Sequence, residues 1–420
     1  MLLFSVRSTY QGMYAKLNQN IKQKYPNIFT VFGGPHPTFY PQLIYDDKAI
    51  DAVCIGEAED AIVDFIQRFE DQGDYHLTPN FWVRTQSKIY QNPVRKLIEN
   101  LDTILFPDRD LLNAYPITRT FPIRNFITSR GCPYNCTYCF NHAYNKIYQG
   151  LGKRIRRRSV DNVIAEIEEE QKQHPFQVVH FEDDIFVMQG KWLEDFALKY
   201  KHKIGLPFVC NARAELVTEK NVAYIKNAGC ISVCLGVEAG DEVVRKELLN
   251  RNNTDSVTIN CVRLLQNAGI SILTENILGL PETSIADDFK TLELNRMLKP
   301  SYANPSIYQP YPGTVLADHA QVIGEFSGNY NDIKDFFSDS GLNLKHKREL
   351  ANLNYLFSFC VEYHHISPWL LNKLIRLPFV RLPFQGIYLL WKRYALTNRI
   401  FPMKLNLKQW FHIIYRVIFR

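Results

Sequence analysis

The sequence has few cysteines, little net charge and none of the features of a secretory leader. Nine cysteines among 420 residues are too few for a disulfide-stabilised scaffold. The opening residues lack the charged start, apolar run and small-residue cleavage site of a signal peptide. The 49 basic residues exceed the 43 acidic ones by a margin too small to indicate nucleic-acid binding. We therefore expect a protein of the reducing cytoplasm without a nucleic-acid partner.

Long apolar runs are also missing. A membrane-spanning helix needs about 20 consecutive, mostly apolar residues. The best candidate begins at Gly386 and is stopped by Lys392, so no span is predicted. What the sequence does contain is ample material for buried cores, since 46% of its residues are hydrophobic and 13% aromatic. Its length favours two domains.

Residues 1–100 predict an α/β domain. The expected elements are an apolar strand at 2–6, a helix at 11–24 and strands at 28–32 and 52–55. Because a buried strand would stand at the very start, we expect the domain to be incomplete, without the elements that normally precede and flank such a strand. Residues 101–118, with two prolines and a run of charges, predict a linker.

Residues 119–325 repeat a strand-then-helix pattern six times. The expected strands lie at 126–128, 178–181, 208–210, 231–235, 272–278 and 305–308. The expected helices lie at 160–173, 192–202, 221–228, 256–267 and 287–298. This alternation predicts a parallel sheet covered by helices, with ligands at the C-terminal ends of the strands. Residues 326–420 predict a mainly helical extension, rich in aromatic and basic residues, with no catalytic pattern.

Cys132, Cys136 and Cys139 lie in a loop directly after the first of these strands. Three thiolates in eight residues can meet at one soft metal centre only if the loop wraps around it. No fourth cysteine follows before Cys210, so three protein ligands would leave one metal position open for chemistry. The alternatives are a zinc site completed by His142 and a set of unliganded core cysteines. The other six cysteines lie in apolar segments and are expected in the core: Cys54, Cys210, Cys230, Cys234, Cys261 and Cys360.

The Cys-x3-Cys-x2-Cys spacing, with Tyr138 just before the last cysteine, resembles the signature of the radical S-adenosylmethionine (SAM) superfamily. The resemblance implies a partial (β/α)6 barrel with a [4Fe–4S] cluster on the three cysteines and SAM on the open iron, and it places Tyr138 among the SAM-contacting residues. In such enzymes one electron cleaves SAM to methionine and a 5′-deoxyadenosyl radical, which abstracts hydrogen from a substrate. No further catalytic residue is assigned.

Polar residues that follow the next strands strengthen the resemblance. Glu182, Asp183 and Asp184 are similar to the family's acidic motif for the SAM amino group, since an ammonium needs an anionic or carbonyl partner. Arg213 would pair with the SAM carboxylate, and Glu238 resembles a residue that hydrogen-bonds SAM. The alternatives are helix caps for the two aspartates and an ordinary ion pair for the arginine. The family's order of loops favours the SAM interpretation.

The N-terminal segment resembles the second half of a Rossmann-like cobalamin-binding domain. Ser5 and the Gly33-Gly34 pair would line the nucleotide tail, where backbone approaches a ligand closely. The family's Asp-x-His-x-x-Gly loop, whose histidine ligates cobalt, does not occur in the sequence, and His36 is no substitute. The chain is then truncated, or binds cobalamin without that ligand, or binds none. We expect poor cobalamin binding.

The leading hypothesis is an enzyme that cleaves SAM reductively and abstracts hydrogen, with methyl transfer to an unactivated carbon if cobalamin is present. The competing hypothesis is a non-catalytic iron–sulfur or zinc protein. The resemblance implies a small-molecule or lipid substrate and a low-potential electron donor such as flavodoxin or ferredoxin. Nothing in the sequence identifies the substrate.

Two basic segments remain. Residues 153–158 would bind a phosphate-bearing substrate or, as we favour, form a solvated face. Residues 410–420 mix bulky apolar and basic side chains as interfacial helices do. They predict either peripheral membrane contact of a cytoplasmic protein or packing against the barrel.

Overall fold

The computed structural model describes residues 1–188, 190–333, 336–337, 339–378, 381–403 and 409. By their contacts, residues group into two compact units. The first, called the N-terminal unit, comprises Met1–Glu99, Pro133–Arg154 and Gln309–Leu344. The second, called the barrel unit, comprises Asn100–Cys132, Ile155–Tyr308 and Lys345–Arg420.

A five-stranded sheet forms the centre of the N-terminal unit. Its order is β1 (Leu2–Ser5), β2 (Thr30–Gly33), β3 (Ala52–Cys54), β4 (Phe81–Arg84) and β5 (Ile89–Gln91). The first three strands are parallel, and the last two pair antiparallel. The strands predicted near 2–6, 28–32 and 52–55 are confirmed, whereas the sequence patterns did not predict the antiparallel pair.

Both faces of this sheet are buried against apolar side chains. Alternate residues of β2 and β3 point to opposite faces. On one face, Val31 and Cys54 pack with Phe65 and Phe81, whose rings stack 4.2 Å apart. On the other face lie Phe32 and other apolar side chains. The helices of the unit are α1 (Gln11–Lys24), α2 (Pro35–Phe39), α3 (Leu43–Asp46), α4 (Glu59–Glu70), α7 (Phe140–Ile147) and α13 (Val315–Val322).

The barrel unit has a six-stranded parallel sheet in the order β13, β12, β11, β10, β9, β6, so that strands neighbouring in this series are neighbours in the sheet. Their bounds are β6 (Ile123–Phe126), β9 (Val178–Phe181), β10 (Phe208–Ala212), β11 (Cys230–Glu238), β12 (Ser271–Leu278) and β13 (Tyr302–Ile307). This is the predicted partial (β/α)6 barrel. The first strand lies three residues earlier than expected, because pairing of Ile123 with Val178 sets its register.

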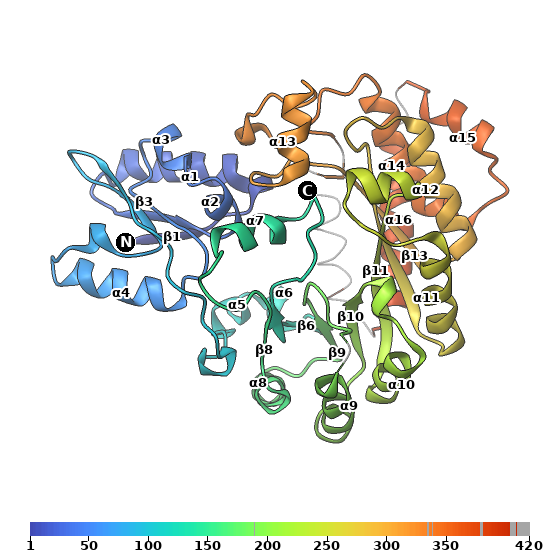
Figure 1. Ribbon diagram of the computed structural model, residues 1–420, viewed down its shortest axis with the longest axis horizontal. Helices are drawn as coiled ribbons and strands as arrows, with labels where there is room; N and C mark the ends of the chain where they lie inside the picture. Colours follow the sequence, from blue (N-terminus) through green and yellow to red (C-terminus); the bar gives the residue numbers. More distant parts are fainter. Residues whose placement is uncertain (189, 334–335, 338, 379–380, 404–408, 410–420) are drawn as a thin grey trace. The chain divides into compact units, whose positions relative to one another are not determined.

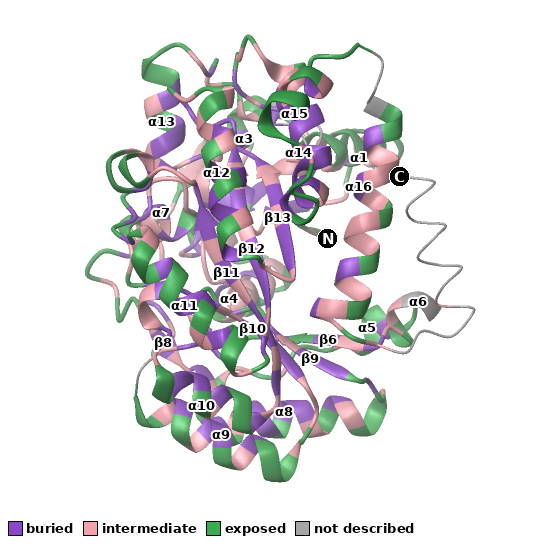
Figure 2. Ribbon diagram, turned by 90° about the vertical axis from the view of Figure 1, so that its right-hand side faces the viewer, coloured by how far each residue is buried: buried purple, intermediate pink, exposed green. Residues whose placement is uncertain are grey.

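Five helices cover the outer face of this sheet (Figure 1). They are α8 (Val160–Gln173), α9 (Lys191–Lys203), α10 (Glu219–Ala228), α11 (Asp255–Asn267) and α12 (Ile285–Leu298). Local chemistry sets where they begin: side-chain oxygens of Ser159, Thr218 and Thr254 accept from backbone amides of the first turn. Between helices and sheet lies a continuous apolar core, and Figure 2 shows the strands largely buried.

The C-terminal region is helical in its described part, as predicted. Its helices are α14 (Lys347–Glu362), α15 (Pro368–Ile375), α16 (Arg381–Ala395) and the π-helical turn η7 (Leu396–Ile400). Along β11, Val233 and Leu235 face the outer helices, so Ser232 and Cys234 point to the inner face. Ser232 donates to the carbonyl of Ile400 at 2.8 Å, and α16 with η7 therefore packs on that inner face.

Residues 410–420, for which the sequence predicts either membrane contact or packing on the barrel, lie outside the described residues. Within the described part of the chain, no helix is both long enough and apolar enough to cross a membrane.

Short elements complete the two units: β7 (Ser129–Arg130), β8 (Arg156–Arg157), α5 (Asp110–Asn113) and α6 (Pro116–Arg119), with 3-10 turns at Ser8–Tyr10, Tyr75–Leu77, Leu101–Thr103, Ala214–Leu216 and Tyr330–Asp332 and a further π-helical turn at Val244–Leu248.

Candidate cofactor site

Three of the barrel strands end at or just before polar residues that the sequence singled out. The β9 strand ends at Phe181, directly before the acidic motif, and β10 ends at Ala212, directly before Arg213. Glu238 is the last residue of β11. Because the sheet is parallel, these ends share one edge, where ligands of such sheets bind.

The cysteine loop follows β6. Cys132 and Cys136 are buried, Cys139 is half-buried, and all nine cysteines of the chain are described without any disulfide. Gly131 has φ of +90°, a left-handed conformation that turns the chain into the loop. The Cys139 amide donates to the Cys136 carbonyl at 3.2 Å, and Cys139 is the N-cap of α7.

The arrangement of donors distinguishes between metal sites. Within the described ranges, no three His, Cys, Asp or Glu side chains form a group that could hold one metal ion. A zinc site completed by His142 would need four ligands around a single ion. The cysteines of a [4Fe–4S] cluster bind different irons, and three thiols at this spacing fit that donor set.

Asp183 is almost fully buried, and its carboxylate faces the start of the cysteine loop. It accepts hydrogen bonds from the Thr128 amide at 3.1 Å, the Thr128 hydroxyl at 2.8 Å and the Ser129 hydroxyl. Burial raises the pKa of Asp183 above its ordinary value, although these bonds and the charge of Arg157 oppose the shift. The carboxylate thus holds the segment that leads to Cys132.

Glu182 and Asp184, on either side of Asp183, are exposed. The Glu182 carboxylate accepts from the Asn125 side-chain amide at 3.0 Å and lies 3.1 Å from Nδ1 of His180. Asn125 lies on β6, His180 lies on the neighbouring strand β9, and Glu182 directly follows β9. The acidic motif, which directly follows β9, thus presents one buried carboxylate between two exposed ones.

Arg213 is buried and forms an ion pair with Glu215. Both Nε and Nη2 of Arg213 lie 2.7 Å from one carboxylate oxygen of that residue. The sequence-level alternative of an ion pair is thus present, but on a buried arginine at the strand edge. A buried guanidinium that is paired with a carboxylate keeps a defined direction, as binding of a second carboxylate would require.

Glu238 is buried and has φ of +68°, so the strand bulges at its last residue. A side chain at Gly236 would collide with the Glu238 carboxylate, which explains the glycine at that position. Arg251 donates to the Gly236 carbonyl at 2.5 Å and lies 3.6 Å from the Glu238 carboxylate. The sequence analysis did not single out Arg251, since nothing in the local pattern marks it.

A second carboxylate on the inner face was also missed. Glu275 of β12 accepts from the Asn304 side-chain amide at 2.7 Å. Burial and the nearby charge of Glu238 raise the pKa of Glu275 to about 7, although Asn304 and Lys392 act in the opposite direction. Its place in the alternation of β12 was the one available signal, because a charged residue stood at an inner-face position of an apolar strand.

The N-terminal unit holds the helix that follows the cysteines. Tyr148, just after α7, accepts at its hydroxyl from the Glu57 amide at 2.9 Å, and a side chain at Gly56 would collide with that hydroxyl. The Glu57 carboxylate accepts from the Ile98 amide at 3.1 Å. The Gly56-Glu57 motif therefore anchors α7, while Tyr138 is half-buried in the loop before it.

Contacts within the N-terminal unit explain why the second residue of the Gly33-Gly34 pair is a glycine. Gly34 has φ of +91°, and a Cβ there would lie 2.9 Å from the Val6 amide nitrogen and 3.1 Å from Oγ of Ser5. His36 is fully buried, with Nδ1 3.1 Å from the Ser8 hydroxyl, and burial lowers its pKa to about 4. His36 is thus a neutral imidazole packed in the interior of the N-terminal unit.

The basic run at 153–158 is not one solvated face. Its first two residues are exposed, but Arg157 donates to the Phe186 carbonyl at 2.7 Å and lies 3.6 Å over the Trp192 ring. Arg158 pairs with Glu166 at 2.5 Å. The favoured interpretation is wrong for these arginines, because β8 turns them into the protein.

Residues 126–294 match the model of the radical SAM superfamily, and residues 1–66 match the B12 binding domain. The chain thus contains a radical SAM domain. Its cofactors are a [4Fe–4S] cluster and SAM, as the cysteine loop predicted, and a domain of the B12-binding type precedes the barrel. The expectations of fold and of an enzyme are confirmed.

Three curated relatives illustrate the family. An uncharacterised methyltransferase of Pyrococcus horikoshii is 29% identical over 76% of this chain and 69% of its own length. The anaerobic magnesium-protoporphyrin IX monomethyl ester cyclase of Rubrivivax gelatinosus is 28% identical over 73% and 55%. The hopanoid C-3 methylase of Methylococcus capsulatus is 24% identical over 71% and 56%. The matched region of this enzyme thus spans little more than half of two of these relatives.

Two solved structures share the fold. The cobalamin-dependent SAM radical enzyme OxsB has a TM-score of 0.66 at 15% identity, covering 99% of this chain and 66% of that one. The radical SAM methyltransferase TsrM of Kitasatospora setae has a TM-score of 0.63 at 17% identity, covering 77% and 65%. At these identities the likeness concerns the fold alone.

Proposed function

We propose that this radical SAM enzyme abstracts hydrogen from a small-molecule or lipid substrate and transfers a methyl group to a carbon of it. The observation that carries the proposal is the three-cysteine loop directly after the first strand of a six-stranded parallel sheet. When bound, the cluster and SAM supply the 5′-deoxyadenosyl radical. The methyltransferase and methylase names of the relatives support methyl transfer.

The chain's own residues would bind and orient these groups. Thiolates of Cys132, Cys136 and Cys139 would hold the cluster. The exposed acids beside Asp183 offer anionic partners for the SAM amino group. This proposal retains all the SAM-contacting residues predicted from the sequence: Tyr138, Glu182, Asp183, Asp184, Arg213 and Glu238.

Arg213 and Glu238 stand at adjacent strand ends with opposite charges. The guanidinium would pair with the SAM carboxylate as a planar fork. Glu238, held from behind by Arg251, would accept a hydrogen bond from a SAM hydroxyl or amine. Substitution of either residue should raise the KM for SAM without loss of iron.

The function is tested by anaerobic reconstitution with iron and sulfide, followed by dithionite and SAM and by measurement of 5′-deoxyadenosine. Cys132→Ala, Cys136→Ala and Cys139→Ala should abolish both the product and the cluster absorbance near ~400 nm, which reports thiolate bound to iron. Cys230→Ala is the matched control, because Cys230 lies in the core beneath the outer helices. A full cluster that yields no 5′-deoxyadenosine would refute the proposal.

Methyl transfer to an unactivated carbon needs a methyl carrier, and the match of residues 1–66 supports cobalamin in that role. Equilibrium dialysis with hydroxocobalamin tests this part separately. Stoichiometric binding at micromolar concentration supports methyl transfer, whereas its absence leaves hydrogen abstraction alone. A reduced flavodoxin or ferredoxin in place of dithionite tests the proposed electron donor.

A further inference from the structure

The C-terminal end of the chain has an unusual charge distribution. Residues 363–420 contain ten lysines and arginines and no aspartate or glutamate, although the whole chain has 43 acidic residues. All the acidic side chains therefore precede this segment. The exposed cations of such a segment attract anionic partners.

Helix α15 within this segment carries apolar side chains on both its buried and its exposed side. Leu371 and Ile375 are buried, and the Ile375 carbonyl accepts from the side-chain amide of Asn352 on α14 at 2.8 Å. The opposite side of α15 exposes Trp369, 66% accessible, and its neighbour Leu370. One face thus packs on the barrel unit, and the other presents apolar side chains outward.

Basic side chains accompany these exposed apolar ones. Lys373 lies 3.7 Å over the Trp369 ring, and both Lys373 and Arg376 are exposed. Leu377, 44% accessible, follows directly. An aromatic ring, leucines and cations on one helix face are the composition of helices that lie in a membrane interface.

Helix α16 repeats the pattern. Phe384 and Tyr388 are buried on the side that faces the protein, whereas Leu382 and Leu390 are 79% and 73% accessible. Both helices pack on α14, within the same unit. The exposed residues of α15 and of the two positions after it are called the apolar–basic face: Trp369, Leu370, Lys373, Arg376 and Leu377.

We propose that the apolar–basic face binds the surface of a membrane that contains anionic lipids. Trp369 and the leucines would enter the interface, and Lys373 and Arg376 would lie among the headgroups. A nucleic acid would satisfy the cations but leave the leucines in water, so the membrane is the better fit. The inference concerns attachment on the surface, and it stands apart from the proposed radical chemistry.

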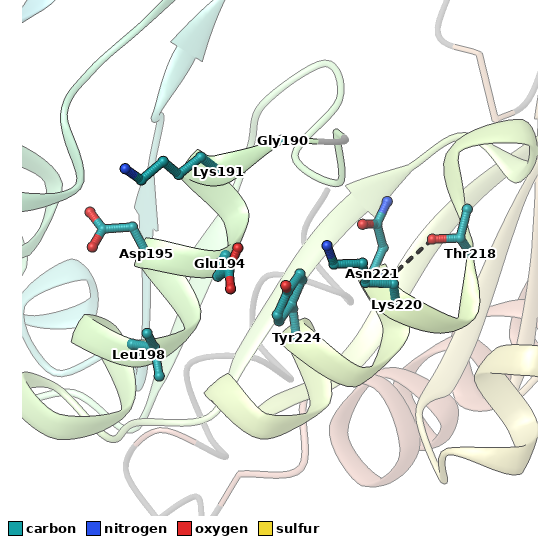
Figure 3. A pocket seen from close by; sticks show the side chains of 9 residues that line it. All are labelled: Gly190, Lys191, Glu194, Asp195, Leu198, Thr218, Lys220, Asn221 and Tyr224. Atoms are coloured by element: carbon teal, nitrogen blue, oxygen red, sulfur yellow. Dashed lines mark hydrogen bonds between the residues drawn. The ribbon is translucent and has the colours of Figure 1, made fainter.

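A groove elsewhere on the barrel unit provides a matched control surface. The cavity of about 770 Å³ between α9 and α10 also presents Lys191, Lys220 and the exposed Leu198 (Figure 3). It differs because Glu194 and Asp195 stand among these residues. A surface with both signs of charge should not be attracted to anionic lipid.

The test is co-sedimentation of the full chain with vesicles of phosphatidylcholine alone or with phosphatidylglycerol. Wild type should sediment with the anionic vesicles, and binding should weaken as salt is raised. Lys373→Gln with Arg376→Gln should weaken it about 25-fold, since each cation contributes roughly fivefold at an anionic surface. Trp369→Ser with Leu377→Ser should also weaken it.

Lys191→Gln with Lys220→Gln should bind as wild type does, and circular dichroism should show that every variant is folded. The proposal is overturned if wild type does not bind anionic vesicles, or if the control pair weakens binding as much as the α15 pairs do. It is also overturned if the α15 variants bind normally, or if the chain binds a DNA or RNA duplex and no vesicle. None of these readouts depends on the cluster or on SAM.

Discussion

Two replacements of Asp183 can separate the loss of its hydrogen-bond acceptors from the loss of its negative charge. Its oxygens accept from the Thr128 amide, the Thr128 hydroxyl and the Ser129 hydroxyl, three donors of the segment that leads to the cysteines. Asp183→Asn keeps an amide oxygen that can accept from the same donors and removes the charge. Asp183→Ala removes every acceptor.

The structure predicts unequal costs for the two variants. Each buried polar group left without a partner costs roughly 1–3 kcal/mol, so Asp183→Ala should lower the free energy of unfolding by about 3 kcal/mol or more. Burial raises the pKa of Asp183, which means that the charge itself is unfavourable in this environment. Asp183→Asn should therefore cost only about 1 kcal/mol.

Urea unfolding of the apoprotein measures both variants, and amide hydrogen exchange reports whether Thr128 remains protected. Asp183→Ala should also bind less iron on reconstitution, because the base of the cysteine loop is released. Asp184→Asn is the matched control, since Asp184 is exposed and should leave stability and iron content unchanged. Equal stability of the alanine and asparagine variants, or full protection of Thr128 in Asp183→Ala, would refute the reasoning.

Two further outcomes follow from single sites. The pKa of Glu275 is about 7 in the folded protein against an ordinary value of 4.5, so the folded state holds a proton that the unfolded state releases between these values. Glu275 therefore makes stability fall as pH rises from about 4.5 to about 7, and Glu275→Gln should flatten urea-denaturation midpoints measured across that range. A Cβ at Gly240 would collide with the backbone of α12, so Gly240→Ala should lower the free energy of unfolding by about 2 kcal/mol or more. Gly12→Ala, at an open position inside α1, should instead raise the free energy of unfolding by up to ~1 kcal/mol. Thermal unfolding measures both glycine variants, and a shift of both midpoints in the same direction would contradict these expectations.

Local patterns in the sequence were sufficient for several features. The helix at 160–173 was predicted with its observed bounds, because the apolar period and the Ser159 cap lie within a few neighbouring residues. The spacing of Cys132, Cys136 and Cys139 likewise depends only on a short loop. The strand order followed from repeated alternation, since each right-handed crossover places the next strand beside the last.

Other features depend on residues that are far apart in the chain. The first barrel strand begins at Ile123 because pairing with Val178 selects the register, and a short apolar run cannot specify its own partner. The same holds for the antiparallel pair after β3. These elements needed the assembled sheet to define them.

The different burial of the three carboxylates in the acidic motif likewise depends on the tertiary structure. From the sequence, Glu182, Asp183 and Asp184 are three equivalent carboxylates, and only the folded chain buries the middle one against Thr128. Glu275 acquires its raised pKa from burial and from Glu238, a residue on another strand. The sequence by itself determined which polar side chains follow the strands and in which order, because those properties are local; solvent exclusion and distance between strands, which set each side chain's charge and partner, exist only in the folded chain.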